Sequence, residues 1–249
     1  MTKIGILVPS TSNKRPWNKI EDTTLYTVFL KTFLTTYCKQ HTYTIYLVID
    51  DDDKVYSDPN NKNKLLRFIN IMKNVELEFI STNGIPKGWV THMWNRAFQK
   101  AYDDNCDYFF QSGDDIQFLT KEWVSDSIKK LSENGNIGLT GPLDLGRIKG
   151  GNIQSQPGGS RFIQTQSFVS RKHMEIFGHY FPPEIKNWFC DDWITRVYYP
   201  NYFYSISNKF IINQGGNPRY NPSGSLYPND PVKKLCDELV DKHKLLLPK

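Results

Sequence analysis

Three groups of adjacent aspartates each follow a hydrophobic segment of the chain. Carboxylates placed side by side repel one another, and burying them without a counter-charge is costly. Mg²⁺ and Mn²⁺ prefer such hard oxygen ligands. The pattern therefore predicts a divalent-metal site that handles phosphate groups. The groups are Asp50 to Asp53 after the run 43–49, Asp114 and Asp115 after 108–110, and Asp191 and Asp192 after Trp188 and Phe189.

The pair Asp114 and Asp115 carries the strongest signal. Gly113 allows a sharp backbone turn directly after an aromatic strand, and two carboxylates there would hold Mn²⁺ or Mg²⁺ on a diphosphate. The cation would act as a Lewis acid on the leaving phosphate. The alternative is a plain turn whose aspartates are solvated.

Size and composition indicate one globular α/β domain. The chain has 249 residues, of which 39% are hydrophobic and 14% aromatic, enough for a large core. Its four cysteines form no C-x-x-C pair, so we expect reduced thiols rather than zinc or disulfides. The net charge of +5 is dispersed, which argues against a nucleic-acid partner. The short apolar start predicts neither a signal peptide nor a membrane span, and we expect a cytoplasmic protein.

Alternating strand and helix patterns position the aspartates in the first half of the chain. Repeated strand–helix alternation favours a mostly parallel, doubly wound sheet, in which ligands collect at the carboxyl ends of the strands. The first two aspartate groups fall at such ends. The predicted strands are 4–8, 43–49, 75–80 and 108–111, and the predicted helices are 22–37, 64–72 and 89–102.

The second half is predicted to complete the same domain, because no linker divides the chain. We expect residues 1–115 and residues 116–249 to form the two halves of this domain. Predicted helices are 122–134, 171–178 and 232–247; predicted strands are 137–140 and 161–169; 198–212 is β-prone and 141–160 reads as a mobile loop.

The order of these segments resembles that of GT-A glycosyltransferases. The likeness covers about residues 4–193 and rests on the polar loop after the first strand, the acid-tipped second strand, the helix carrying Trp89 and Asn95, and the two later acidic pairs. The Gly-Asp-Asp variant is similar to small glycosyltransferases of large DNA viruses of algae and amoebae, which would place the protein in a host cytoplasm. The family usually carries Asp-x-Asp. Since Gly113 replaces the first acid, Asp114 is expected to share the ligand role with Asp115.

The resemblance also implies a nucleotide-binding half over residues 1–115, an acceptor-binding half over residues 116–249, and roles for the other motifs. A carboxylate of the second-strand group would contact the uracil or ribose, and one of the last pair would be the catalytic base. Arg219 could hold two phosphate oxygens at once. The alternatives are a solvated acidic turn, core packing for Trp89, a surface position for Arg219 and a helix N-cap for the last acidic pair. The candidate donor-binding residues are Pro9, Ser10, Thr11, Asp50, Asp51, Asp52, Trp89, Asn95, Asp114 and Arg219, the metal ligands are Asp114 and Asp115, and the base is Asp191 or Asp192.

The expected function is metal-dependent transfer of a sugar from a nucleotide-sugar to a hydroxyl of a glycan or protein. The resemblance implies a UDP-sugar as the donor and inversion at the anomeric carbon. An aspartate beside an aromatic wall has a raised pKa, which suits proton abstraction. A sugar-nucleotide nucleotidyltransferase is the second interpretation, although the loop 9–15 lacks the glycines expected of one. A carbohydrate-binding protein, whose aromatic residues stack on sugars, is the third.

Overall fold

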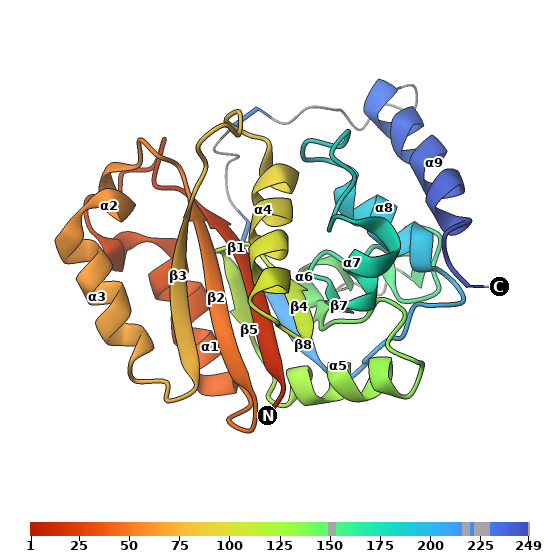
Figure 1. The fold of residues 1–249 in the computed structure, drawn as a ribbon, viewed down its shortest axis with the longest axis horizontal. Coiled ribbons are helices and arrows are strands. Elements are labelled where there is room, and N and C mark those ends of the chain that lie inside the picture. The colour runs from red at the N-terminus through yellow and green to blue at the C-terminus, as the bar shows by residue number, and fades with distance from the viewer. Residues whose placement is uncertain (149–152, 216–219, 222–229, 249) are drawn as a thin grey trace.

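A five-stranded sheet in the order β3-β2-β1-β4-β7 forms the centre of the computed structural model, which describes residues 1–148, 153–215, 220–221 and 230–248. Its first four strands are parallel and β7 runs antiparallel to β4 (Figure 1). The predicted mostly parallel α/β sheet is therefore confirmed. The strands are β1 (Lys3–Ser10), β2 (Thr42–Ile49), β3 (Val75–Ser81), β4 (Tyr108–Gln111) and β7 (Phe168–Ser170).

Both faces of this sheet are covered by helices. Ile4, Ile6 and Val8 of β1 enter one core and Leu7 enters the other, as the near-continuous apolar strands predict. On the first face lie η2 (Leu25–Leu30), which continues into α1 (Lys31–Thr36), α2 (Lys54–Ser57), α3 (Pro59–Ile69) and α5 (Trp123–Ser132). On the second lie α4 (Val90–Asp103), α7 (Lys172–Phe177), α8 (Cys190–Tyr198) and α9 (Pro231–Lys244).

Helix α4 lies in front of the sheet in Figure 1 and packs closely on β1. A Cβ atom added to Gly5 of β1 would lie only 2.9 Å from Cβ of Ala101 in this helix. The absence of a side chain at Gly5 thus permits the contact. Because the helix lies along β1 and β2, its first turn reaches the carboxyl edge of the sheet.

A second, three-stranded sheet in the order β5-β8-β6 follows the acidic pair. Its strand β8 pairs antiparallel with β5 and parallel with β6. Two short helices, α6 and η3, come after β6, and η1 (Ile20–Asp22) precedes η2. The ranges are β5 (Ile116–Phe118), β6 (Leu143–Asp144), β8 (Phe210–Asn213), α6 (Leu145–Ile148) and η3 (Ile153–Ser155).

Several predicted elements of the second half are wrong. The segment 137–140 forms only isolated bridges, 161–169 is extended as a strand only from Phe168, and the β-prone stretch 198–212 contains a strand only from Phe210. The segment 141–160, predicted as a loop, contains β6 and α6. Tyr202, Phe203 and Tyr204 are half-buried and lie outside the named strands, and β-propensity reports such packing more than backbone preference.

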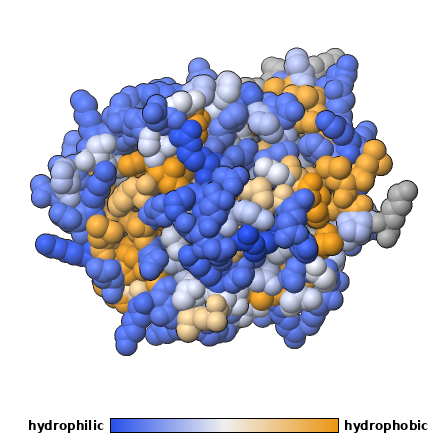
Figure 2. Space-filling model, in the orientation of Figure 1, coloured by the Kyte–Doolittle hydropathy of each residue, from blue (hydrophilic) through white to orange (hydrophobic). Residues whose placement is uncertain are grey.

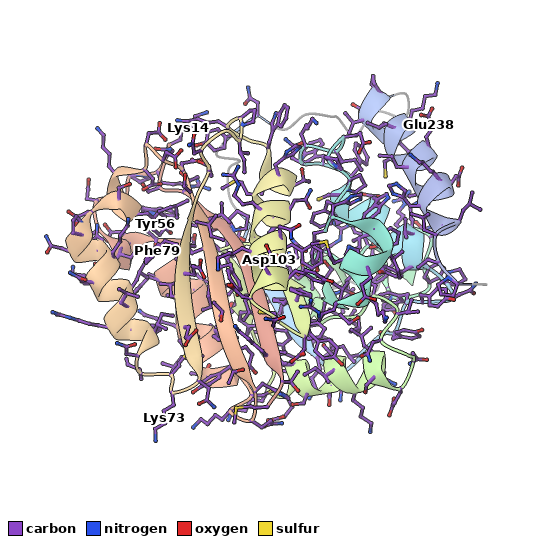
Figure 3. All side chains as sticks on the ribbon, in the orientation of Figure 1. Lys14, Tyr56, Lys73, Phe79, Asp103 and Glu238 are labelled. Atoms are coloured by element: carbon purple, nitrogen blue, oxygen red, sulfur yellow. The ribbon has the colours of Figure 1, made fainter. Side chains whose placement is uncertain are left out.

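The carboxyl and amino ends of the parallel strands lie on opposite sides of the molecule. Lys14, which follows β1, and Lys73, which precedes β3, lie at opposite ends in Figure 3 and mark the carboxyl and amino edges. Figure 2 shows a mostly hydrophilic face over α4, with hydrophobic side chains gathered beside α3 and near the end of α9. At the latter place Leu245 and Leu246 are exposed. No helix within the described ranges is long and apolar enough to cross a membrane.

Asp53 holds the carboxyl edge together, because its buried carboxylate joins two loops. It caps α2 by accepting from the backbone N–H groups of Val55 and Tyr56 at 3.0 and 2.9 Å. It also accepts from the hydroxyls of Thr11 and Ser12 and from the Ser12 N–H. The loop after β1 is thereby fixed against the loop after β2.

Replacing Asp53 with alanine is expected to lower the free energy of unfolding by about 3 kcal/mol, because several donors would lose a buried acceptor. Urea unfolding followed by circular dichroism measures this change. Asp51→Ala is the matched control. Its carboxylate is exposed and accepts from the Ser81 hydroxyl at the surface, so the free energy of unfolding of this control should change by no more than about 0.5 kcal/mol. If the free energy of unfolding fell by less than about 1 kcal/mol in Asp53→Ala, water would be replacing the carboxylate as the acceptor.

Candidate active site

A cleft of about 730 Å³ opens at the carboxyl edge of the main sheet. Seven of the residues predicted from the sequence line it, and they come from the ends of β1, β2 and β4 and from the first turn of α8. Since the carboxyl ends of parallel strands meet at one edge, distant segments of the chain converge there. The seven are Pro9, Ser10, Thr11, Asp50, Asp114, Asp115 and Asp191.

Asp114 is fixed from the neighbouring strand. The Ser10 hydroxyl donates to Asp114 Oδ2 at 2.5 Å and is itself 2.7 Å from the Tyr56 hydroxyl. Asp114 is buried, so this charge-assisted hydrogen bond offsets part of the cost of its desolvation. The contact holds the acidic turn after β4 against the end of β1.

Asp50 forms the other wall of the same end of the cleft. Its buried carboxylate accepts from Asn13 Nδ2 at 3.2 Å and from the hydroxyl of Tyr220. Tyr220 also lines the cleft, and the Lys14 ammonium lies 5.1 Å from the centre of its ring. Of the four aspartates after β2, Asp50 is thus the one that faces the cleft.

Asp51 and Asp52 do not line the cleft; both are exposed. Asp51 accepts a hydrogen bond from the Ser81 hydroxyl. Asp52 pairs with Lys87, and this hydrogen bond lowers the pKa of Asp52 below its usual value. The geometry therefore divides the acidic group into one cleft residue, Asp50, one structural residue, Asp53, and two surface residues.

Gly113, which stands where the resembled family carries an acid, gives Asp115 its position. A Cβ atom at residue 113 would lie 2.6 Å from Asp115 Oδ1, so the Asp115 carboxylate occupies the space that a side chain there would need. The backbone carbonyl of Asp115 accepts from the Gln214 N–H at 3.1 Å and joins the small sheet to the acidic turn. The absence of a side chain at Gly113 therefore gives the Asp115 carboxylate room to fold back toward it.

Trp89 and Asn95 lie outside the residues that line the cleft. Trp89 precedes α4, and the Lys186 ammonium lies 4.2 Å from the centre of its ring. The amide of Asn95 donates to the Phe181 carbonyl and accepts from two backbone N–H groups of the segment Tyr180–Phe181. Arg219 lies outside the described residues.

Asp191 and Asp192 occupy the first turn of α8, which begins at Cys190. Neither caps the helix, because the N-cap position belongs to Phe189. Burial raises the pKa of Asp191 to about 6, with a further rise from the charge of Asp192 and a smaller opposing effect of Arg147. Burial also raises the pKa of Asp192. Only Asp191 lines the cleft, so it is the carboxylate placed to meet a ligand there.

Sequence reasoning missed several residues of the cleft. Asp144 is buried and accepts from the N–H groups of Gly146 and Asn213 at 2.9 and 3.3 Å. Arg147 and Trp188 also line the cleft. The motif Leu-Asp-Leu-Gly at 143–146 was the available signal for Asp144, but its segment was interpreted as a loop.

The oxygen ligands in the cleft fit a divalent cation shared with a substrate. Asp114 and Asp115 follow one another on a rigid turn, and Asp144 lines the same cavity. Among the residues that the structure describes, no three acidic, histidine or cysteine side chains group closely enough to enclose a metal on their own. Mg²⁺ is commonly held by one or two carboxylates together with substrate phosphates and water, and that mode matches this set.

No protein-family model and no curated protein matches this chain. Solved structures do match, at low sequence identity. The structure of residues 1–349 of S. aureus TarS in complex with UDP aligns with a TM-score of 0.56 and 13% identity, covering 84% of this chain and 60% of that one. The same TarS fragment in complex with UDP-GlcNAc also gives 0.56 and 13%, covering 88% and 60%.

A mannosyltransferase from Pyrobaculum calidifontis, PcManGT, in complex with GDP-Man and Mn²⁺ gives a TM-score of 0.55 at 13% identity and covers 84% of this chain and 56% of that one. This chain therefore spans about 60% of the length of the structures it resembles. The likeness concerns the fold, which is that of the GT-A glycosyltransferases.

Proposed function

We propose that this protein is a metal-dependent glycosyltransferase that moves a sugar from a nucleotide-sugar to a hydroxyl acceptor with inversion. One observation carries the proposal. Ser10, Asp50, the pair Asp114 and Asp115, and Asp191 line a single cleft at the carboxyl edge of a GT-A sheet. The chain would then divide by role, with residues 1–115 binding the nucleotide and 116–249 the acceptor.

The donor is expected to enter between β1 and β2. Asp50 would accept from the nucleoside, and Pro9, Ser10 and Thr11 would form the facing wall. Two of the similar structures hold UDP or UDP-GlcNAc and a third holds GDP-Man. We favour a UDP-sugar, in keeping with the resemblance in sequence.

Asp114 and Asp115 would hold Mn²⁺ or Mg²⁺ against the donor diphosphate. A cation bound there neutralises the charge that develops on the leaving phosphate. The role of the chain is to orient these carboxylates, which the Ser10 hydrogen bond and the space at Gly113 accomplish. The hard oxygen donors of both residues support this assignment.

Asp191 would act as the general base. Its carboxylate takes the proton of the acceptor hydroxyl while that oxygen forms a bond to the anomeric carbon and the bond from this carbon to the diphosphate oxygen breaks. A pKa of about 6 keeps Asp191 ionised at neutral pH yet more basic than an ordinary aspartate. Such proton transfer contributes about 10²- to 10⁴-fold in rate. Asp192 would raise the basicity of Asp191 through its charge.

Replacing Asp115 with alanine is expected to weaken Mn²⁺-dependent binding of UDP by at least about tenfold, because a charged ligand of the cation is lost. Isothermal titration calorimetry with and without Mn²⁺ measures the effect. Asp103→Ala, which removes an exposed aspartate at the end of α4, should bind as the wild type does. Wild-type protein that takes up no UDP, GDP or other nucleoside diphosphate with either cation would refute the transferase proposal.

Asp191→Asn is expected to leave UDP affinity unchanged and to reduce transfer by about 10²- to 10⁴-fold. In the wild type, kcat/KM should fall as the pH drops through about 6, since protonated Asp191 cannot accept the acceptor proton. Product release at fixed Mn²⁺, followed from pH 5 to 8, gives the profile. Full activity in Asp191→Asn, with loss in Asp192→Asn, would move the base to the second aspartate.

The same substitution should stabilise the metal-free fold at neutral pH. The folded-state pKa of Asp191 lies above its unfolded value, so its contribution to stability is fully present below the unfolded pKa and is lost as the pH rises through about 6. Asparagine carries no charge, so it avoids the cost of burying an ionised carboxylate. The free energy of unfolding of Asp191→Asn should therefore exceed that of the wild type by about 1–3 kcal/mol at pH 7, and the difference should vanish below about pH 4. Urea unfolding at both pH values decides this, and equal stability at pH 7 would contradict the raised pKa.

A further inference from the structure

Trp188 differs from the other five tryptophans, all of which lie within the described residues. Its side chain is 39% exposed and it lines the cleft. The others are buried or half-buried; for example, Trp94 Nε1 donates to the Ser112 carbonyl and Trp193 Nε1 to His243. An exposed tryptophan forgoes a large burial energy, and such residues commonly mark a binding surface.

The exposure of Trp188 does not come from a loosely held segment. The Thr91 N–H at the start of α4 donates to the Lys186 carbonyl at 3.2 Å, and Asn187 Nδ2 donates to the Gly88 carbonyl at 3.1 Å. The Trp188 N–H donates to Asn187 Oδ1 at 2.7 Å. These bonds tie the segment before α8 to the first turn of α4, so the fold itself presents the indole.

Trp188 also lies close in the chain to Asp191, the proposed base, and both residues line the cleft. It precedes Asp191 by three residues, and between them Phe189 adopts the left-handed conformation, with φ of 71°, from which α8 begins. Val90 and Met93 of α4 add apolar surface to the same cavity. The cleft that Asp191 lines therefore also has apolar surface.

The charge of the cleft favours a neutral ligand beside the donor. Its described lining residues include five aspartates and two arginines, Arg15 and Arg147. A nucleoside diphosphate adds further negative charge, and even a divalent cation leaves an excess of anions. A second anionic ligand would be repelled.

We propose that Trp188 is the stacking platform for the acceptor and that the acceptor is a neutral sugar, neither an acidic saccharide nor the hydroxyl of a peptide. This inference rests on the proposed function. A pyranose ring has an apolar face of C–H groups and a rim of hydroxyls. An indole covers the apolar face, as aromatic side chains do for amphipathic ligands, and leaves one hydroxyl of the rim to give its proton to Asp191. A serine or threonine side chain offers no face of that size.

Transfer assays on the full chain test the choice of acceptor. With Mn²⁺ and the UDP-sugar that the protein hydrolyses slowly, the acceptors are methyl glycosides of glucose, galactose, mannose and N-acetylglucosamine, methyl glucuronide, and a serine- and threonine-containing peptide. We expect transfer to a neutral glycoside only. Transfer to the peptide or the glucuronide with equal efficiency would overturn the proposal.

Variants of Trp188 test the platform itself. Trp188→Ala should raise KM for the glycoside at least tenfold, leave UDP affinity and slow donor hydrolysis within twofold, and be largely rescued in Trp188→Phe. Leu119→Ala, which shortens another exposed apolar side chain (37% exposed) away from the cleft, should match the wild type. A loss of UDP affinity in Trp188→Ala would instead assign the ring to the donor.

A binding measurement separates this proposal from the underlying function. In protein labelled with 5-fluorotryptophan, the ¹⁹F resonance missing from Trp188→Phe identifies residue 188. It should shift when a neutral methyl glycoside is added to protein saturated with UDP and Mn²⁺. If UDP binds and the donor is hydrolysed but no neutral glycoside moves this resonance, the acceptor proposal alone fails; if UDP does not bind, both fail.

Discussion

The hydrogen bond from Ser10 to Asp114 joins the ends of two neighbouring parallel strands, β1 and β4. Both residues are buried, and the Asp53 carboxylate holds the loop after β1 from the other side. The carboxyl edge is therefore a connected polar network in which Asp50, Asp53 and Asp114 each have donors. Charges can be kept at this edge because hydrogen bonds replace part of their hydration.

The network also explains why neighbouring aspartates differ so much. Asp50 and Asp53 are buried while Asp51 and Asp52 face water, because the chain turns sharply after β2 and sends successive side chains in different directions. In the first turn of α8 both aspartates are half-buried, but only Asp191 lines the cleft. Residue type alone carries none of this information.

The sequence predicts the first half of the fold well because its signals are local. Apolar runs such as 43–49 and the helix-spaced residues of 89–102 give strands and helices close to the observed bounds. Because the carboxyl ends of parallel strands lie side by side, the acidic residues that follow these strands are expected to converge. The Asp114 and Asp115 pair and the group Asp50 to Asp53 could therefore be placed at one edge from sequence alone, whereas the choice of Asp50 among the four required the structure.

The second half depends on contacts between segments far apart in the chain. Asp144 enters the cleft because β6 pairs with β8, more than sixty residues later, and no local pattern announces that pairing. Asn95 shows the reverse case, since the family resemblance implied a donor contact, whereas its side chain lies outside the cleft lining and holds the backbone of Tyr180 and Phe181. Which donor a polar group meets is decided by tertiary packing.

The left-handed backbone at Phe189 has a consequence for selectivity. Few side chains adopt this conformation readily, and here it fixes how the segment before α8 passes into the helix axis. The main chain thus sets the separation of the Cα atoms of residues 188 and 191, whose side chains both line the cleft. Regiochemistry at such a centre would depend on backbone geometry as well as on the side chains.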